Sequence, residues 1–319
     1  MLAAVYRTTG GSEVLSVEQV QTPQPGPGEV RVRLRVAGVN PTDWKKRTTA
    51  SPEGLQVPGQ DGAGEVDAVG EGVDPARVGE RVWVWFAAAK GRRWGTAAQW
   101  TVVPSRQAVA LPDGVSYDLG AGLGIPAMTA WHCLFSGGPL DGRDVLVAGG
   151  AGAVGNAAVA LARRGGARVV ATVSDDEKAA LARAAGAHAV VRYRDADAAQ
   201  QVRAVATGGV HRMVEVALGA NIDLDLAVAA PHAVVSTYAD GELRVEVRPL
   251  MIANLTLQFV LVYGLADADL DAAVAGVSAA VAAGELPGLP VTRFPLAQVA
   301  AAHDAVQSGV LGKVLVDLP

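Results

Sequence analysis

Four glycines within seven residues stand at the spacing of a phosphate-binding turn. The stretch G-G-A-G-A-V-G-N (149–156) follows the apolar run V-L-V (145–147), and Gly150, Gly152 and Gly155 form the pattern G-x-G-x-x-G. Glycine costs about 0.5–1 kcal/mol relative to alanine in a regular element, so this density indicates a need for bare backbone. In a dinucleotide fold the first glycine makes the turn, the second lets the backbone approach a pyrophosphate, and the third allows close helix–strand packing.

The surrounding residues give this motif the required context. The loop opens a helix, which the pattern A-A-V-A-L-A-R-R (157–164) indicates. A helix N-terminus has unpaired N–H groups and a partial positive charge, and both favour phosphate. The next strand-like run, R-V-V-A-T-V (168–173), ends about 20 residues further on, as the fingerprint requires. The three glycines, Ala153 and Val154 are therefore predicted to bind a dinucleotide.

The end of that second strand indicates which dinucleotide is bound. An NAD site usually has an acidic residue there, which holds the ribose 2′-hydroxyl. This position is Val173, followed by Ser174, and Lys178 lies one helical turn further on. A hydroxyl and a cation suit a 2′-phosphate, which predicts NADPH, and Tyr193 after the third strand would close the same pocket. Asp175 would repel a phosphate if it turned inward, but as a first-turn acid it is favoured by the helix dipole. Lys178 alternatively is a solvated helix charge.

The elements that must position these residues change in character along the chain. The first third shows short β-branched runs, turn signals and no helical periodicity, which indicates an antiparallel barrel or sandwich. From about residue 125, strands alternate with helical segments of about ten residues, which predicts βαβ units and a parallel sheet. The tail (267–319) reads as an Ala/Val-rich helix, a second helix near 296–307 and a final strand at 313–318.

Composition limits the possible classes of function. The 319 residues suggest about two domains, and a net charge of -5 argues against nucleic-acid or anionic-membrane partners. No apolar run approaches the roughly 20 residues of a membrane span, and no signal peptide is recognisable, so a cytosolic location is expected. Cys133 is the one cysteine, which excludes an intramolecular disulfide and a cysteine-based metal cluster.

Five stretches together carry a family resemblance over nearly the whole chain. They are V-A-G-V-N-P-T-D-W-K (36–45), P-G-Q-D-G-A-G-E-V (58–66), A-G-G-A-G-A-V-G (148–155), V-V-R-Y-R (190–194), and F-P-L-A-Q-V-A-A-A-H (294–303) with the closing G-K-V-L-V (312–316). The chain resembles the zinc-free quinone oxidoreductase (zeta-crystallin-like) branch of the medium-chain dehydrogenase/reductase superfamily.

The resemblance implies an α/β protein of two domains. One is a GroES-like β-barrel catalytic domain, expected at residues 1–124 and completed by 264–319. The other is a Rossmann domain with a doubly wound parallel sheet, expected at 125–263 and binding NADPH. Gly312 and Lys313 of the closing stretch are implied to contribute to the cofactor site.

Departures from the zinc-dependent relatives indicate chemistry without a metal. Those relatives carry a cysteine at the position of Asn40 and a G-H-E loop where this chain reads Gly59-Gln60-Asp61. Catalytic zinc needs about three protein ligands, and the five histidines are scattered without ligand spacing. No metal is expected, and His303 is expected to pack or cap rather than react.

The remaining chemistry is hydride transfer to quinones or α,β-unsaturated carbonyls, as the resemblance implies. The main catalytic need is then a donor for the developing oxyanion. Lys45 occupies a position where many quinone oxidoreductases carry tyrosine, and a protonated lysine is a stronger oxyanion partner. Asn40 is assigned to hydrogen-bond nicotinamide or substrate, Asp43 to hold Lys45 or its loop, and Thr129 to face the nicotinamide. Asn40 as a turn residue and Lys45 as a solvated charge stay open as alternatives.

Two other readings of the function are possible. One is a nucleotide-binding sensor or structural protein without turnover, and the other is a pathway-specific enoyl or keto reductase. The polar set of Asn40, Lys45 and Thr129 favours an enzyme. We also expect a homodimer, because the apolar, β-rich segment Asn254–Val262 is long for an exposed sheet edge, and such edges are normally paired or covered.

Overall fold

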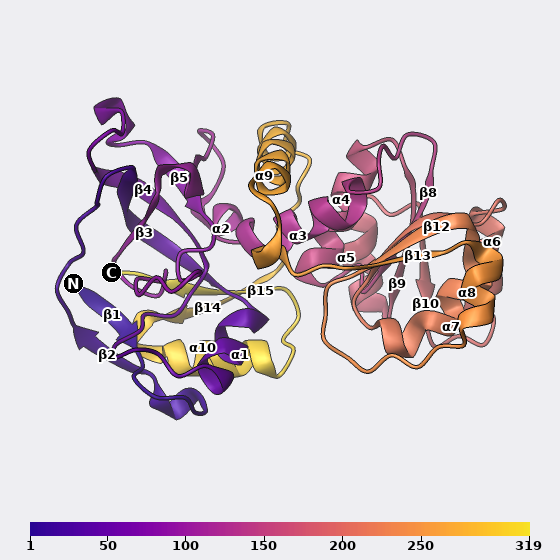
Figure 1. The fold of residues 1–319 in the computed structure, drawn as a ribbon, viewed down its shortest axis with the longest axis horizontal. Coiled ribbons are helices and arrows are strands. Elements are labelled where there is room, and N and C mark those ends of the chain that lie inside the picture. The colour runs from indigo at the N-terminus through magenta and orange to yellow at the C-terminus, as the bar shows by residue number, and fades with distance from the viewer. The chain divides into compact units, whose positions relative to one another are not determined.

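The computed structural model describes residues 1–319 and divides into two compact units. The first unit contains Met1–Ile125 and Pro290–Pro319, and the second contains Pro126–Leu289. Figure 1 follows the chain from indigo through orange to yellow, and the yellow C-terminal elements belong to the same unit as the indigo N-terminal ones. No helix in the chain is both long and apolar enough to cross a membrane.

The first unit is built mainly from antiparallel strands with three short helices. A seven-stranded sheet has the order β14-β15-β3-β4-β5-β7, with β6 also paired to β3, and β1 and β2 form a separate pair. The strands of this unit are β1 (Leu2–Val5), β2 (Ser16–Gln19), β3 (Glu29–Val39), β4 (Asp61–Val69), β5 (Arg81–Val84), β6 (Trp100–Pro104), β7 (Ala108–Ala110), β14 (Val291–Pro295) and β15 (Lys313–Asp317). The helices of this unit are α1 (Pro41–Thr49), α2 (Tyr117–Gly120) and α10 (Val299–Gln307).

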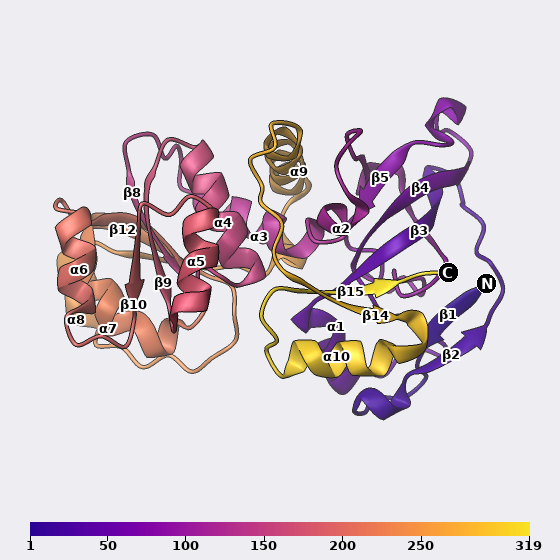
Figure 2. The same ribbon diagram turned by 180° about the vertical axis from the view of Figure 1, so that it is seen from behind.

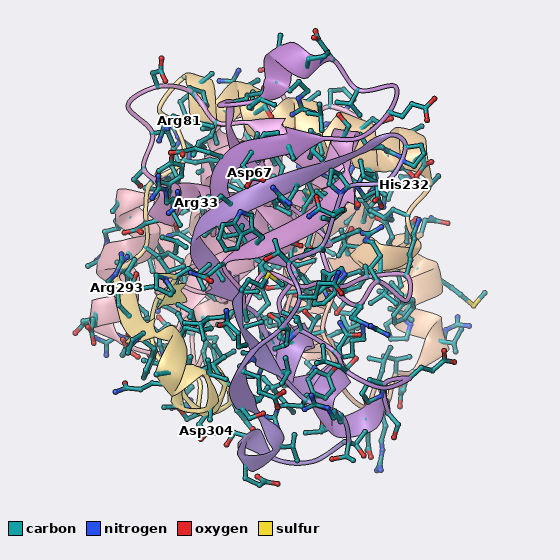
Figure 3. The ribbon with its side chains drawn as sticks, turned by 90° about the vertical axis from the view of Figure 1, so that its left-hand side faces the viewer. Arg33, Asp67, Arg81, His232, Arg293 and Asp304 are labelled. Atoms are coloured by element: carbon teal, nitrogen blue, oxygen red, sulfur yellow. The ribbon has the colours of Figure 1, made fainter.

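Strand β3 shows the predicted alternation of inward and outward side chains. Val32, Leu34 and Val36 are buried, whereas the intervening arginines lie on the other face, as the period of two in a strand requires. On that outer face the Arg33 guanidinium lies 6.0 Å from the Trp100 ring centroid, and Arg33 and Asp67 are both visible in Figure 3. The alternation therefore separates an apolar core from a polar sheet surface.

Helix α1 corrects the sequence reading of the first third, which found no helical periodicity. Asn40 is the extended N-cap residue, Pro41 occupies the first helical position where its missing N–H costs nothing, and the helix runs to Thr49. The two buried residues of α1 are Asp43 and Arg47, four positions apart on one face. Because that face is charged rather than apolar, hydrophobic periodicity gave no signal.

The second unit contains the predicted parallel sheet with helices between its strands. The strand order is β10-β9-β8-β11-β12-β13, all parallel, which is the order 3-2-1-4-5-6 of dinucleotide-binding folds. Its strands are β8 (Asp144–Ala148), β9 (Arg168–Val173), β10 (Ala189–Arg192), β11 (Val210–Glu215), β12 (Ala229–Thr237) and β13 (Thr256–Phe259). Strand β8 is buried throughout, as expected of a parallel strand covered on both faces.

The helices of the second unit fall into two groups by their contacts. Helices α4 and α5 pack against β8, β9 and β10. Helix α7 contacts α6 and α8, and these three pack against β10, β11 and β12. Figures 1 and 2 show these helices around the sheet of this unit. The helices of the second unit are α3 (Gly124–Phe135, which begins in the first unit), α4 (Ala153–Arg164), α5 (Asp176–Ala184), α6 (Ala198–Val205), α7 (Leu218–Val228), α8 (Val247–Ala253) and α9 (Asp267–Ala282).

The chain returns to the first unit later than predicted. The sequence reading placed this return at residue 264, but it occurs at Pro290, so α9 belongs to the second unit. Helix α9 contacts α4 and buries one apolar stripe that includes Leu270 and Val277. A Cβ atom at Gly276 would lie 2.2 Å from atoms of the Trp131 ring on α3, so the absent side chain permits this close packing. The boundary between the two units therefore lies after α9, between Leu289 and Pro290.

Candidate active site

The glycine loop lies between β8 and α4, where the sequence predicted it. A Cβ atom at Gly155 would lie 2.2 Å from the carbonyl oxygen of Gly149, and one at Gly150 would lie 2.7 Å from the Cβ of Ala171. At Gly152 a Cβ atom would make only an ordinary contact, 3.4 Å from the carbonyl oxygen of Gly149, and this glycine is exposed directly before α4. The first and third glycines therefore allow close packing, and the second leaves the helix N-terminus with Ala153 and Val154 open to a phosphate.

Ser174 and Lys178 meet at the end of β9. The Lys178 ammonium donates to the Ser174 hydroxyl oxygen at 2.8 Å and lies 3.2 Å from Oδ2 of Asp175. Val173, where an NAD site would carry an acid, is buried and apolar. A hydroxyl and a cation thus lie together where the sequence predicted them, although the cation is partly neutralised by its neighbour.

Asp175 acts as the N-cap of α5. Its Oδ1 accepts the backbone N–H of Lys178 at 2.9 Å, and its Oδ2 accepts the Ser174 hydroxyl at 2.8 Å. The backbone hydrogen bond, with those of Ser174 and Lys178, lowers the pKa of Asp175 to about 2. Tyr193 follows β10 and its N–H donates to the carbonyl of Val173, so it lies next to the same strand end.

A second polar cluster is buried in the first unit around Asn40. The Lys313 ammonium donates to Asn40 Oδ1 at 2.7 Å, and Asn40 Nδ2 donates to Asp61 Oδ2 at 2.7 Å. Asn40 is 2% exposed, Asp61 0% and Lys313 7%, so the cluster is almost dry. The amide of Asn40 is therefore held at both ends by charged groups of opposite sign.

Asp43 holds the start of α1, which is one of its two predicted roles. Its Oδ2 accepts the backbone N–H of Asn40 at 2.8 Å, which is one half of a capping box. Burial, with a smaller effect of the Asp61 charge, raises the pKa of Asp43 to about 7. Burial likewise raises the pKa of Asp61 to about 6 and lowers the pKa of Lys313. The cluster contains two carboxyl groups and one ammonium group in low dielectric, so it retains a proton more readily than exposed carboxylates do.

The structure places the other predicted residues as follows. Lys45 lies on α1, half-buried, with its ammonium 5.9 Å from the Trp44 ring centroid. The lysine brought to Asn40 is instead Lys313, whose predicted role was in the cofactor site. Gly312 has a φ of 93°, and a Cβ there would lie 2.1 Å from the carbonyl oxygen of Pro290, so this turn requires glycine.

The residues of α3 and α10 singled out by the sequence are buried. Thr129 is 4% exposed, and Cys133 is fully buried, which raises the pKa of its thiol to about 12 and makes it a poor nucleophile. His303 is 1% exposed, and burial lowers its pKa to about 4, in agreement with a packing role. None of the described residues forms a group of three His, Cys, Asp or Glu side chains placed to share a metal ion.

Sequence reasoning missed a pair of buried carboxyl groups in the second unit. Glu215 at the end of β11 accepts the Asn221 amide at 2.9 Å, and Asp225 on α7 has no hydrogen-bond partner for either oxygen. Burial and the charge of Glu215 raise the pKa of Asp225 to about 8. A pocket of 540 Å³ in the same unit is lined by residues that follow β11 and β12, such as Ala217, and by Thr237 and Phe259, which end β12 and β13. The only sequence signal was an acid ending an apolar strand.

Comparisons with known proteins cover both units. Residues 26–113 match the alcohol dehydrogenase GroES-like domain family, and residues 153–279 match the zinc-binding dehydrogenase family. A quinone oxidoreductase from Lama guanicoe is 28% identical over 315 residues, which span 96% of this chain and 94% of that protein.

Solved structures agree over the full length. A mycobacterial quinone oxidoreductase is 30% identical with a TM-score of 0.86, covering 99% of both chains. A mycobacterial protein in complex with NADPH is 29% identical with a TM-score of 0.84, again covering 99% of both. An NAD-dependent alcohol dehydrogenase is 27% identical with a TM-score of 0.88, covering 100% of both.

Proposed function

The chain belongs to the quinone oxidoreductase branch of the medium-chain dehydrogenase/reductase superfamily, and on this premise we propose that it reduces quinones or α,β-unsaturated carbonyls with NADPH and without zinc. The family makes it an NAD(P)-dependent oxidoreductase. The choice of cofactor, the substrate class and the absence of a metal from the reaction form the proposal. The observation that carries it is the Ser174–Lys178 pair at the end of β9.

NADPH is favoured over NADH by the groups after β9. A 2′-phosphate is an anion with several acceptor oxygens. The Lys178 ammonium has three N–H donors, of which one is given to the Ser174 hydroxyl oxygen at 2.8 Å, and it can donate to such an anion. An NAD site would need an acid near Val173, and the nearest acid, Asp175, is engaged as the α5 N-cap. The open backbone at Gly152 suits the pyrophosphate of either cofactor.

A reaction without zinc is supported by the donors around Asn40. Zinc sites in proteins use His, Cys and carboxylate ligands, with about three from the protein at a catalytic site. Here the amide oxygen of Asn40 accepts the Lys313 ammonium, and Asp61 accepts the Asn40 amide and the Ile125 N–H. The Lys313 ammonium therefore already supplies the positive charge that a zinc ion would bring to this cluster.

The chain's own residues then have to bind and orient the cofactor and the substrate and stabilise the negative charge that develops during reduction. NADPH supplies a hydride when bound. As the substrate is reduced, negative charge collects on its carbonyl oxygen, and a donor aimed at that oxygen is the largest contribution the protein makes. We assign this donor to the Lys45 ammonium, and we assign contact with nicotinamide or substrate to the Asn40 amide.

The test is oxidation of NADPH followed at 340 nm with a panel of quinones and enones, with NADH in parallel. Turnover of at least one class with NADPH preferred supports the proposal. Tight binding of NADPH without turnover of any substrate would favour the nucleotide-binding sensor, and equal use of NADH would remove the cofactor assignment.

We also propose that two copies pair through β13. This strand ends the parallel sheet, and only β12 pairs with it. Phe259 and Leu261 are each 67% exposed, and Met251 and Ile252 of the nearby α8 are 68% and 73% exposed. Large apolar side chains beside an unpaired sheet edge are normally covered in solution.

A further inference from the structure

The Asn40 amide has an orientation that its neighbours determine. A planar amide presents an oxygen at one end and an NH₂ group at the other, and a 180° rotation exchanges them. An ammonium can only donate and an ionised carboxylate can only accept. Lys313 therefore requires the Asn40 oxygen, and Asp61 requires its nitrogen, at 2.7 Å in each case. Rotation would place NH₂ against ammonium and oxygen against carboxylate.

The neighbours of Asn40 are themselves fixed. The Ile125 N–H lies 3.0 Å from both carboxylate oxygens of Asp61, so Asp61 cannot turn without losing that bond. The backbone N–H of Asn40 is held by Asp43 at 2.8 Å. Asp61 is thus anchored independently of the amide it orients, and Asp43 fixes the backbone of Asn40 itself.

Glycines make room for both charged side chains. A Cβ at Gly124 would lie 2.1 Å from Asp61 Oδ1. One at Gly38 would lie 2.0 Å from the carbonyl oxygen of Ala121 and also 3.2 Å from Cε of Lys313. Burying such a cluster is a poor source of stability, because the desolvation penalty of the charges offsets most of their attraction. A role other than stability is therefore the better explanation for charges in this location.

We propose that Lys313 and Asp61 are positioning residues that fix the Asn40 amide in one of its two orientations for catalysis. The inference rests on the proposed function, since it assigns to Asn40 a contact with nicotinamide or substrate. Asn40 Nδ2 keeps one hydrogen beyond its bond to Asp61, and the cluster gives this hydrogen a fixed direction. Lys313 acts through Asn40 and not as a direct ligand of the cofactor.

An exchange of the two side chains separates orientation from stability. The double variant Asn40→Asp/Asp61→Asn keeps one amide, one carboxylate and the ammonium, and every hydrogen bond of the cluster can re-form. Each single variant should lower the melting temperature, because Asn40→Asp sets two carboxylates together and Asp61→Asn removes the main counter-charge of Lys313. The double variant should recover the melting temperature but stay at least tenfold below wild type in kcat/KM, because residue 40 no longer presents an amide N–H.

Lys313→Met tests the other end of the amide. We expect kcat to fall at least about tenfold, since a misplacement of about 1 Å can cost about 10²-fold, with the Kd for NADPH within about twofold of wild type. Lys46→Met is the matched control: Lys46 is a half-buried lysine of α1 that donates to the Ala88 carbonyl at 2.7 Å, and its loss should leave kcat unchanged.

A readout without turnover uses the side-chain amide of Asn40 in ¹H–¹⁵N spectra of the cofactor-free protein, assigned by its loss in Asn40→Asp. Lys313→Met should shift and broaden this pair of signals, and Lys46→Met should not. Unchanged signals in Lys313→Met, a tenfold weaker NADPH affinity in that variant, or wild-type kcat/KM in the exchanged double variant would each overturn the inference. If wild type turns over no substrate, the proposed function fails, and the spectra still decide whether Lys313 orients the amide.

Discussion

Lys178 and Asp175 flank Ser174 with opposite charges, so substitutions at the two positions should move NADPH affinity in opposite directions. The Lys178 ammonium lies 2.8 Å from the Ser174 oxygen and 3.2 Å from Asp175 Oδ2. If this group binds the 2′-phosphate, Lys178→Ala removes a charge-assisted hydrogen bond from NADPH and nothing from NADH. Asp175→Asn removes a negative charge beside the phosphate and keeps a side-chain oxygen to cap α5.

The size of the Lys178 effect follows from its exposure. Hydrogen bonds to charged groups contribute about 1.5–3 kcal/mol, and the Lys178 side chain is 41% exposed, which places it at the lower end. About 1.4 kcal/mol is a tenfold change, so the Kd for NADPH should rise about tenfold in Lys178→Ala, with the Kd for NADH within twofold. Asp175→Asn should tighten NADPH about threefold, because a like charge several ångströms from the phosphate is removed.

Binding measured by cofactor fluorescence at two ionic strengths provides the assay. The Debye length falls from about 30 Å at 0.01 M salt to about 10 Å at 0.1 M, so both effects should shrink as salt rises. Circular dichroism melts of each variant check that α5 stays folded. Equal changes in NADPH and NADH affinity, or weaker NADPH binding in Asp175→Asn with α5 intact, would refute the assignment of the 2′-phosphate to this site.

The remaining predictions concern the oxyanion donor, a buried acid, the metal and the assembly. Lys45→Ala should lower kcat and kcat/KM together by on the order of 10²-fold, with Lys45→Tyr retaining more activity; values within twofold of wild type for both would exclude a catalytic role. The raised pKa of Asp225, about 8, means that the folded protein binds more protons than the unfolded chain between about pH 4 and 8, so this contribution to stability is present at low pH and is lost as pH rises through 8. Asp225→Asn should match wild type at about pH 4 and melt at a higher temperature than wild type at pH 9, with the difference growing between these values, and a parallel loss of stability in both proteins would contradict this. Elemental analysis should find no stoichiometric zinc, and a chelator should leave the rate unchanged; zinc-restored activity would count against a metal-free reaction. Light scattering at micromolar concentration should give a dimer mass for wild type and a monomer mass for Phe259→Lys/Leu261→Lys, and a monomeric wild type would end that proposal.

Structural features that depend only on residues close together in the chain could be predicted from the sequence. The glycine loop, the strand that precedes it and the helix that follows are determined by backbone conformation and hydrophobic pattern within about 20 residues. The meeting of Ser174 with Lys178 is of the same kind, because residues four apart on a helix start lie on one side of it. These elements lie where the sequence placed them.

Features that depend on distant pairing could not be predicted in this way. Lys313 donates to Asn40 across 273 positions of sequence, and neither residue carries a local sign of the other. Helix α1 was missed because it buries Asp43 and Arg47, and α9 was assigned to the wrong unit because an apolar stripe does not reveal which surface it covers. A buried charge is tolerated only beside partners that the folded chain supplies, so tertiary structure alone decides which polar residues form the cluster around Asn40.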